Sequence, residues 1–135
     1  MKDKSKKSGI TRDVFVRVGD AEVFPSRTAF LENFIRGKKL KLLDVGNLGE
    51  GDVLVPVEKF VEENGGEYFG LDVNENLANK LGRKNQLLGD LHDLRASVPD
   101  ASFDCIYAGE IIEHSWMPGK MIAECNRILN KDGYL

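Results

Sequence analysis

The sequence predicts an α/β fold in which a mostly parallel sheet carries helices on both faces. Two observations support this class. From residue 40 onward, short apolar runs alternate with segments of helical periodicity, and glycine or polar turns separate them. The first run, residues 40–45, is almost continuously apolar, as expected for a strand covered on both faces. Strands that alternate with helices are joined by right-handed crossovers, which produce a parallel sheet.

The N-terminal residues have a different character. Residues 1–10 are expected to form a disordered basic tail, because the first eight residues carry a charge of +3 while the whole chain carries −3. The remainder of the chain therefore carries −6, which argues against a nucleic-acid backbone as the main partner.

Residues 11–37 are expected to form a hairpin and a helix. Apolar residues alternate with polar ones on both sides of Gly19–Asp20, which favours a short hairpin. Ser26 is the expected N-cap of the helix, and Gly37 is its expected end. The third predicted region is residues 38–135.

That region is expected to contain five strands and three helices. Glycines follow the first two helices, and a proline begins the third. The expected strands are residues 40–45, 68–72, 86–90 and 103–108, with a fifth beginning at residue 134. The expected helices are residues 55–63, 75–81 and a last one from Pro118 to the stop at Asp132–Gly133. In the last helix, the expected apolar face consists of Met121, Ile122, Cys125, Ile128 and Leu129.

Composition narrows the class of protein further. No apolar run approaches the roughly 20 residues of a membrane span, and no secretory signal pattern is found, so we expect a cytoplasmic protein that does not engage a membrane. Cys105 and Cys125 lie in apolar patterns without a CxxC motif or a nearby histidine at metal-ligand spacing. We therefore expect buried thiols and no metal site.

A glycine-rich turn follows the first strand of the predicted sheet. Asp44 ends that strand, and Gly46, Gly49 and Gly51 allow the backbone to turn sharply and approach a ligand closely. Ligands of parallel sheets bind at the carboxyl ends of the strands. Such a turn by itself is a weak signal of function, since glycines also end strands for structural reasons.

Asp72 strengthens the case, because it ends the second strand about twenty residues beyond the glycines, where a carboxylate can accept hydrogen bonds from both ribose hydroxyls. It could instead serve as a helix N-cap, although Asn74 could do so in its place. Dinucleotide binding and S-adenosylmethionine binding both fit this spacing. Asp44 favours the second, since a carboxylate repels a pyrophosphate and attracts the ammonium and sulfonium groups of S-adenosylmethionine.

The ordered motifs from residue 40 to the end resemble those of class I S-adenosylmethionine-dependent methyltransferases of the type 11 kind. The segments that carry the resemblance are residues 42–51, 70–72, 88–91, 102–114 and 127–135. The resemblance implies a Rossmann-like three-layer sandwich with strand order 3-2-1-4-5. It also implies that the chain lacks the last strands of that fold, because the sequence ends as the fifth strand begins.

The resemblance also implies a role for each matching position in binding S-adenosylmethionine. Asp72 would bind the ribose hydroxyls, Val73 one face of the adenine, and Asp90 with the backbone of Leu91 the adenine edge. The glycine turn would line the methionine part of the cofactor through Asp44, Gly46, Asn47, Gly49 and Gly51.

Glu110 and His114 follow the fourth strand, where the methyl acceptor would meet the cofactor, and are the candidates for orienting or deprotonating the acceptor. Structural support of the loop is the alternative role for both, since methyl transfer requires alignment more than a base. The acceptor itself is not identified.

Two departures from the family pattern leave alternatives open. Asn47–Leu48 stands where the family has a shorter, glycine-containing turn, which keeps a non-catalytic binding or scaffold module as the alternative to an enzyme. A NAD-dependent oxidoreductase is the third hypothesis. Because a sheet that stops early would expose an unpaired edge, we also expect that edge to be covered by the N-terminal hairpin or by a second subunit in a homodimer.

Overall fold

The computed structural model describes residues 16–18, 21–24, 26–48 and 57–135. The chain divides into two compact units, Met1–Phe34 and Ile35–Leu135. The basic tail and the Gly19–Asp20 turn lie outside the described residues, as do Gly49 and Gly51. The expected domain boundaries stay predictions.

The first unit contains the expected hairpin. Strand β1 (Val16–Val18) pairs antiparallel with β2 (Ala21–Val23). Helix α1 (Arg27–Ile35) begins where the Ser26 hydroxyl accepts a hydrogen bond of 3.1 Å from the N–H of Ala29, so the expected N-cap is confirmed. The chain leaves the helix at Gly37, where φ is +73°.

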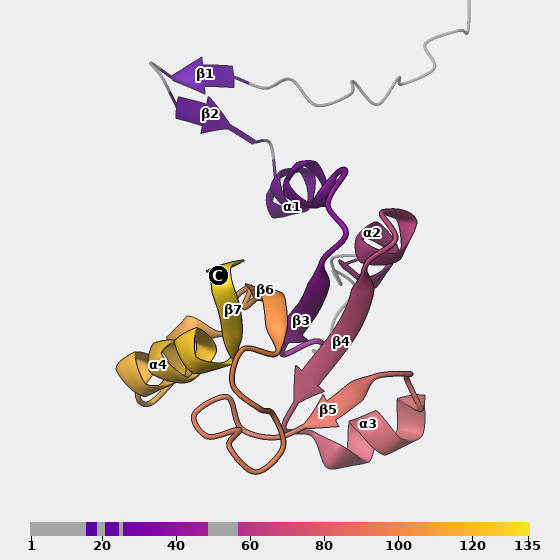
Figure 1. Cartoon of the computed structure of the whole chain (residues 1–135), viewed down its shortest axis with the longest axis vertical. Helices are drawn as coiled ribbons and strands as arrows, with labels where there is room; N and C mark the ends of the chain where they lie inside the picture. Colours follow the sequence, from indigo (N-terminus) through magenta and orange to yellow (C-terminus); the bar gives the residue numbers. More distant parts are fainter. Residues whose placement is uncertain (1–15, 19–20, 25, 49–56) are drawn as a thin grey trace, which may run out of the picture. The chain divides into compact units, whose positions relative to one another are not determined.

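The second unit is built on one five-stranded parallel sheet (Figure 1). Its strands are β3 (Lys41–Val45), β4 (Glu67–Asp72), β5 (Gln86–Leu88), β6 (Phe103–Tyr107) and β7 (Leu129–Tyr134). They lie in the order β5-β4-β3-β6-β7. Counted along this unit, that order is 3-2-1-4-5, so the expected Rossmann-like sandwich is confirmed.

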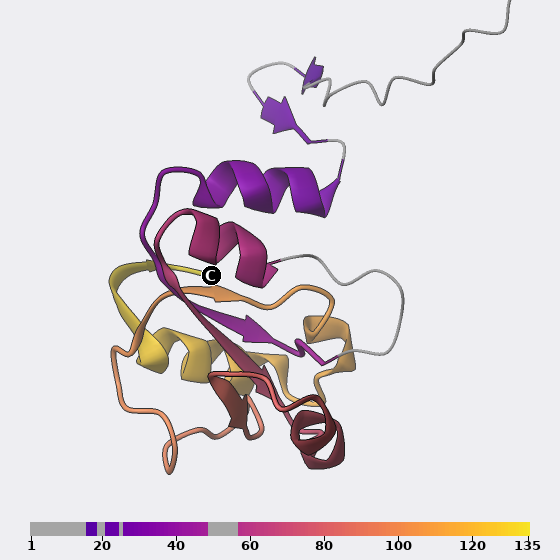
Figure 2. The ribbon, with the colours of Figure 1, turned by 90° about the vertical axis from the view of Figure 1, so that its right-hand side faces the viewer.

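Helices cover both faces of this sheet. These are α2 (Val57–Glu63), α3 (Glu75–Leu81) and α4 (Pro118–Ile128), together with a short 3₁₀ turn, η1 (Ile112–His114). Helices α2 and α3 lie on one side and α4 on the other, and Figure 2 views the sheet from the α2 and α3 side. Helix α3 has both expected ends, because Asn74 caps its first turn and Gly82, with φ of +55°, ends it.

The main core lies between the sheet and α4. Leu43 and Leu71 pack in one buried cluster with Met121, Cys125 and Ile128 of the helix. Each of the leucine, isoleucine and methionine side chains contributes about 1.5–3 kcal/mol through removal from water. Burial also raises the pKa of the Cys125 thiol to about 11, and Cys105 is likewise buried and unpaired, so the expected buried thiols are confirmed.

Two expectations for the last helix are wrong. The helix ends at Ile128 rather than at Asp132–Gly133, because the open edge of β6 offers hydrogen-bond partners and the chain passes directly into β7. The pairing of the two strands contains a register shift, and Gly133 lies where a Cβ atom would come within 2.9 Å of the Asn130 carbonyl oxygen. The apolar face also differs, since Ile122 is 44% exposed while Glu124 is buried.

Candidate cofactor site

The carboxyl ends of β3, β4 and β5 meet at one edge of the sheet. Asp44 pairs with Gly70, and Asp72 pairs with Leu88, so the residues that follow these strands come together. Backbone hydrogen bonds extend beyond the strands: the N–H of Gly46 donates to Leu71 at 2.8 Å, and that of Gly89 donates to Asp72 at 3.1 Å. The tips of the three strands are therefore held in a fixed relation.

A cavity of about 270 Å³ opens at this edge. Its lining includes six of the residues expected to form the site, namely Gly46, Asp72, Val73, Asp90, Leu91 and His114. The volume is just below the usual range for small-molecule pockets, which begins at about 300 Å³.

Gly46 is required by the space at the base of the cavity. Its φ is +71°, and a Cβ atom there would lie 2.6 Å from Cδ1 of Ile111. Only glycine combines this backbone conformation with so close an approach. The expected sharp turn after the first strand of the sheet is therefore present, although Gly49 and Gly51 lie outside the described residues.

Asp72 joins the glycine turn to the tip of β4. Its Oδ2 accepts a hydrogen bond of 3.1 Å from the N–H of Leu48, and its Oδ1 accepts one of 2.9 Å from the N–H of Asn74. Asn74 is the N-cap of α3, so Asp72 is not used for that purpose. Each carboxylate oxygen has a second lone pair, which leaves Asp72 able to accept hydrogen bonds from a ligand.

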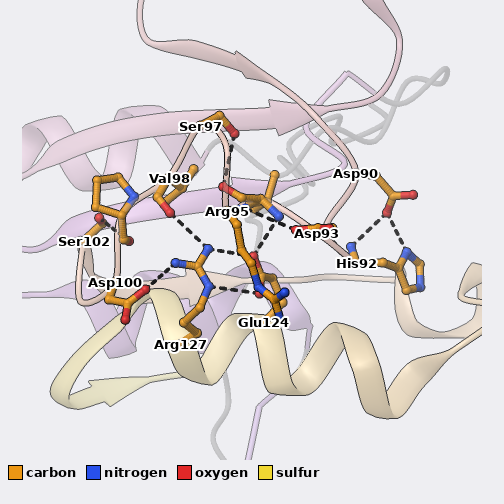
Figure 3. Close-up of polar contacts among 12 residues, drawn as sticks. Asp90, His92, Asp93, Arg95, Ser97, Val98, Asp100, Ser102, Glu124 and Arg127 are labelled. Atoms are coloured by element: carbon orange, nitrogen blue, oxygen red, sulfur yellow. Dashed lines mark hydrogen bonds and ion pairs between the residues drawn. The ribbon is translucent and has the colours of Figure 1, made fainter.

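Asp90 also lines the cavity and is bound by His92 (Figure 3). Its Oδ1 accepts a hydrogen bond of 2.9 Å from the His92 backbone and lies 2.5 Å from Nδ1 of the His92 ring. The backbone bond, followed by the ring contacts, lowers the pKa of Asp90. The carboxylate is therefore ionised at neutral pH, and its side chain is 57% exposed.

Asp44 and Asn47 are not among the described residues of the lining, and their side chains bond other residues of the protein. The Tyr68 hydroxyl donates to Oδ2 of Asp44 at 2.9 Å, and the amides of Asn47 and Gln86 form a reciprocal pair at 2.7 and 2.9 Å. A Cβ atom on Gly70 would lie 2.0 Å from Nδ2 of Asn47, so the glycine makes room for this cluster.

Burial governs the charge of Asp44. It is 8% exposed, and desolvation raises its pKa to about 7 although the Tyr68 hydrogen bond opposes the shift. The sequence at Asn47–Leu48 departs from the family's glycine-containing turn, and the structure explains this in part. Both residues are buried, and Asn47 fills the space beside β4 and β5. The expected contacts of Asp44 and Asn47 with a cofactor stay predictions.

The two candidates on the acceptor side lie around η1. His114 lines the cavity, whereas Glu110 is not among the described residues of the lining. Glu110 has φ of +56°, a left-handed conformation that is uncommon outside glycine and often marks functional sites. Their proposed roles with an acceptor remain untested.

Sequence reasoning did not find the network that supports the segment after Asp90. The carboxylate of buried Glu124 accepts hydrogen bonds from the Leu94 N–H at 2.7 Å and from the Arg127 guanidinium at 2.6 and 3.0 Å (Figure 3). Arg127 also binds Asp100 at 2.6 Å. The i,i+3 spacing of Glu124 and Arg127 was the available signal, but their burial depends on the distant segment around Leu94.

Metal-ligand clusters and membrane-spanning helices are both absent from the residues that the structure describes. In that part of the chain, no group of three or more His, Cys, Asp or Glu side chains could hold a metal ion. None of its helices combines the length and the apolar character needed to cross a membrane.

The hydrogen-bond acceptors and the apolar residues of the lining fit an adenosine group. Two carboxylates, Asp72 and Asp90, lie among apolar residues such as Leu71 and Leu91, and Val73 presents an apolar side chain that is 73% exposed. Carboxylates accept hydrogen bonds from hydroxyl and amino groups, and the apolar residues suit a planar base.

The sheet order and the cavity at its carboxyl edge define a Rossmann-like α/β domain. The chain belongs to the methyltransferase domain family, whose profile matches residues 43–135. No curated protein matches the chain.

Solved structures with the same fold include SAM-dependent methyltransferases. That from Archaeoglobus fulgidus is 22% identical, with a TM-score of 0.58, over 76% of this chain and 47% of its own. That from Aquifex aeolicus is 25% identical, with a TM-score of 0.57, over 77% and 58%. The trans-methyltransferase CalH, in complex with SAH, is 12% identical, with a TM-score of 0.61, over 78% and 34%. The chain thus spans about half the length of the structures that it matches.

Proposed function

We propose that this chain forms the S-adenosylmethionine-binding part of a methyltransferase that acts on an acceptor still to be identified. Membership of the family supports the class of reaction. The observation that carries the proposal is the pair of carboxylates, Asp72 and Asp90, on the lining of one cavity at the carboxyl edge of the sheet.

In this proposal the adenosine group lies across the strand tips. Asp72 accepts hydrogen bonds from the ribose hydroxyls, and Asp90 with the Leu91 backbone binds the adenine edge. Val73 covers one face of the base. Gly46 allows the methionine part to approach the backbone, and its φ of +71° is consistent with that role.

When bound, S-adenosylmethionine supplies an electrophilic methyl group on a sulfonium centre. The residues of this chain would then hold and orient the reactants, and such alignment lowers the barrier of a reaction between two bound groups. His114, which lines the cavity, is the better placed of the two candidates to take up a proton from the acceptor, while Glu110 would shape the loop.

A scaffold without activity is the second candidate. This candidate is supported by the Asn47–Leu48 segment. Both side chains are buried within the protein, and the Asn47 amide is hydrogen-bonded to Gln86. Under either candidate, the cytoplasmic location and the homodimer that covers a sheet edge remain predictions.

Titration calorimetry tests the proposal. We expect saturable one-to-one binding of S-adenosylhomocysteine and S-adenosylmethionine to the full chain, and no comparable binding of NAD. Absence of heat with either sulfur ligand at millimolar concentration would favour the scaffold. Selective binding of NAD would instead identify a dinucleotide site.

A further inference from the structure

His92 connects two segments of the chain that both line the cavity. Its Nδ1 lies 2.5 Å from Oδ1 of Asp90, and its Nε2 lies 2.7 Å from the Ser115 hydroxyl. Asp90 and His92 follow β5, whereas Ser115 follows η1, 23 residues further along the chain. The side chain of His92 is 12% exposed, so the ring is held between these partners.

The chemistry of the partners assigns the roles of the ring nitrogens. A carboxylate only accepts hydrogen bonds, so Nδ1 carries the proton that is donated to Asp90. In the neutral ring, Nε2 then accepts the hydroxyl proton of Ser115. The Ser115 oxygen in turn accepts a bond of 3.3 Å from the N–H of Met117.

This arrangement restrains one oxygen of Asp90 and leaves the other for a ligand. Both hydrogen bonds from His92 go to Oδ1, and Oδ2 has no hydrogen bond to any described residue. A carboxylate whose orientation is held by a neighbour loses less side-chain entropy when it binds a ligand. His92 thereby prepares Asp90 for a donor such as an amino group.

The same ring contacts the most exposed aromatic side chain of the described residues. The His92 and Trp116 ring centroids lie 5.2 Å apart at an interplanar angle of 35°. Trp116 is 72% exposed, and both residues line the cavity. His92 therefore helps to set the position of the Trp116 side chain as well as that of Asp90.

We propose that His92 is a positioning residue for adenine recognition, which aligns Asp90 and couples it through Ser115 to the segment that carries Trp116. The inference rests on the proposed function, because it requires an adenine beside Asp90. It assigns His92 an effect on base selectivity, which a residue with a merely structural role would not have.

The test compares two ligands that differ in the base. S-inosylhomocysteine replaces the adenine amino group of S-adenosylhomocysteine with an oxygen, so it cannot donate to Asp90 from that position. We expect wild type to prefer the adenine ligand and Asp90→Asn to lose most of that preference. His92→Phe keeps an aromatic ring beside Trp116 but removes both hydrogen bonds of the ring, and we expect it to lower the preference by about tenfold.

Matched variants separate the two hydrogen bonds of the ring. His92→Asn retains an N–H near the Nδ1 position and should recover most of the preference for adenine. Ser115→Ala should change the emission of Trp116, the only tryptophan of the chain, with a smaller change in affinity. Ser97→Ala removes the hydroxyl of an exposed serine that donates to the Leu94 carbonyl, and as the control it should bind both ligands as wild type does.

The outcomes distinguish the inference from the proposed function. If Asp90→Asn loses the preference while His92→Phe retains it, or if His92→Phe weakens both ligands equally, the inference is overturned and the proposed function stands. If wild type binds neither ligand, the proposed function fails and the inference fails with it.

Discussion

Two carboxylates at the same edge of the sheet have opposite surroundings. Asp44 is 8% exposed, bonded to Tyr68, and its pKa is raised to about 7 by burial. The side chain of Asp90 is 57% exposed, and hydrogen bonds from His92 lower its pKa. Both residues were identified as cofactor-binding candidates from the sequence motifs in which they lie. The residues around each carboxylate decide whether it is accessible to a ligand. Asp44 is thus buried within the protein, whereas Asp90 is exposed on the lining of the cavity.

The largest expected effect concerns the stability of the Asp44 side. In the unfolded chain Asp44 ionises with the ordinary aspartate pKa of 3.8, whereas the folded pKa is about 7, so the native state holds the additional proton between these values. The free energy of unfolding should therefore fall as pH rises through this window, by up to roughly 4 kcal/mol at 1.36 kcal/mol per pKa unit.

Asp44→Asn should remove that pH dependence, because the amide keeps an oxygen for the Tyr68 hydroxyl without ionising. Urea denaturation of wild type and variant at pH 4.5, 6 and 8 measures the difference. The variant should gain stability over wild type as pH rises, while the exposed control Asp93→Asn should not. Parallel pH profiles for wild type and Asp44→Asn would show that Asp44 does not titrate with a raised pKa.

The next effect concerns the support of the Asp90 side. Glu124→Ala removes the partner of Arg127 and of the Leu94 N–H, and should lower the free energy of unfolding by about 3 kcal/mol. Glu124→Gln retains an acceptor for the Leu94 N–H and should lower the free energy of unfolding by less. Thermal and urea denaturation measure both variants, and a Glu124→Ala protein as stable as wild type would refute the supporting role.

A smaller effect, on ligand affinity, is expected at Asp72. Asp72→Ala should weaken binding of S-adenosylhomocysteine by roughly 1–3 kcal/mol, since hydrogen bonds to a charged group are lost. Glu62→Ala removes an exposed charge on α2 and is the control. Calorimetry gives the affinities, and equal weakening by both variants would attribute the effect to net charge instead of to ribose binding.

Helices and strands were predictable where nearby residues, such as caps and apolar runs, determine their bounds. Asn74 and Gly82 mark both ends of α3, and the apolar run before Gly46 marks β3, so strand order followed from alternation and resemblance. The start of β7 was missed because it depends on the free edge of β6, which the sequence of residues 129–134 does not reveal.

The candidate site was predictable only in part. Gly46, Asp72 and Asp90 follow strands and could be placed at one edge from the sequence. His92 and Glu124 were missed, because their importance arises from partners 23 and 30 residues away. The surroundings of Asp44 were also missed, since the hydroxyl that bonds it comes from Tyr68 on β4, 24 residues further along the chain.

The most direct test of the account is a crystal structure of the chain with S-adenosylhomocysteine. We expect the ribose hydroxyls within hydrogen-bond distance of the Asp72 carboxylate and the adenine edge at Asp90, with Asp44 still bonded to Tyr68. A ligand bound elsewhere, or an adenosine group that contacts neither Asp72 nor Asp90, would contradict it.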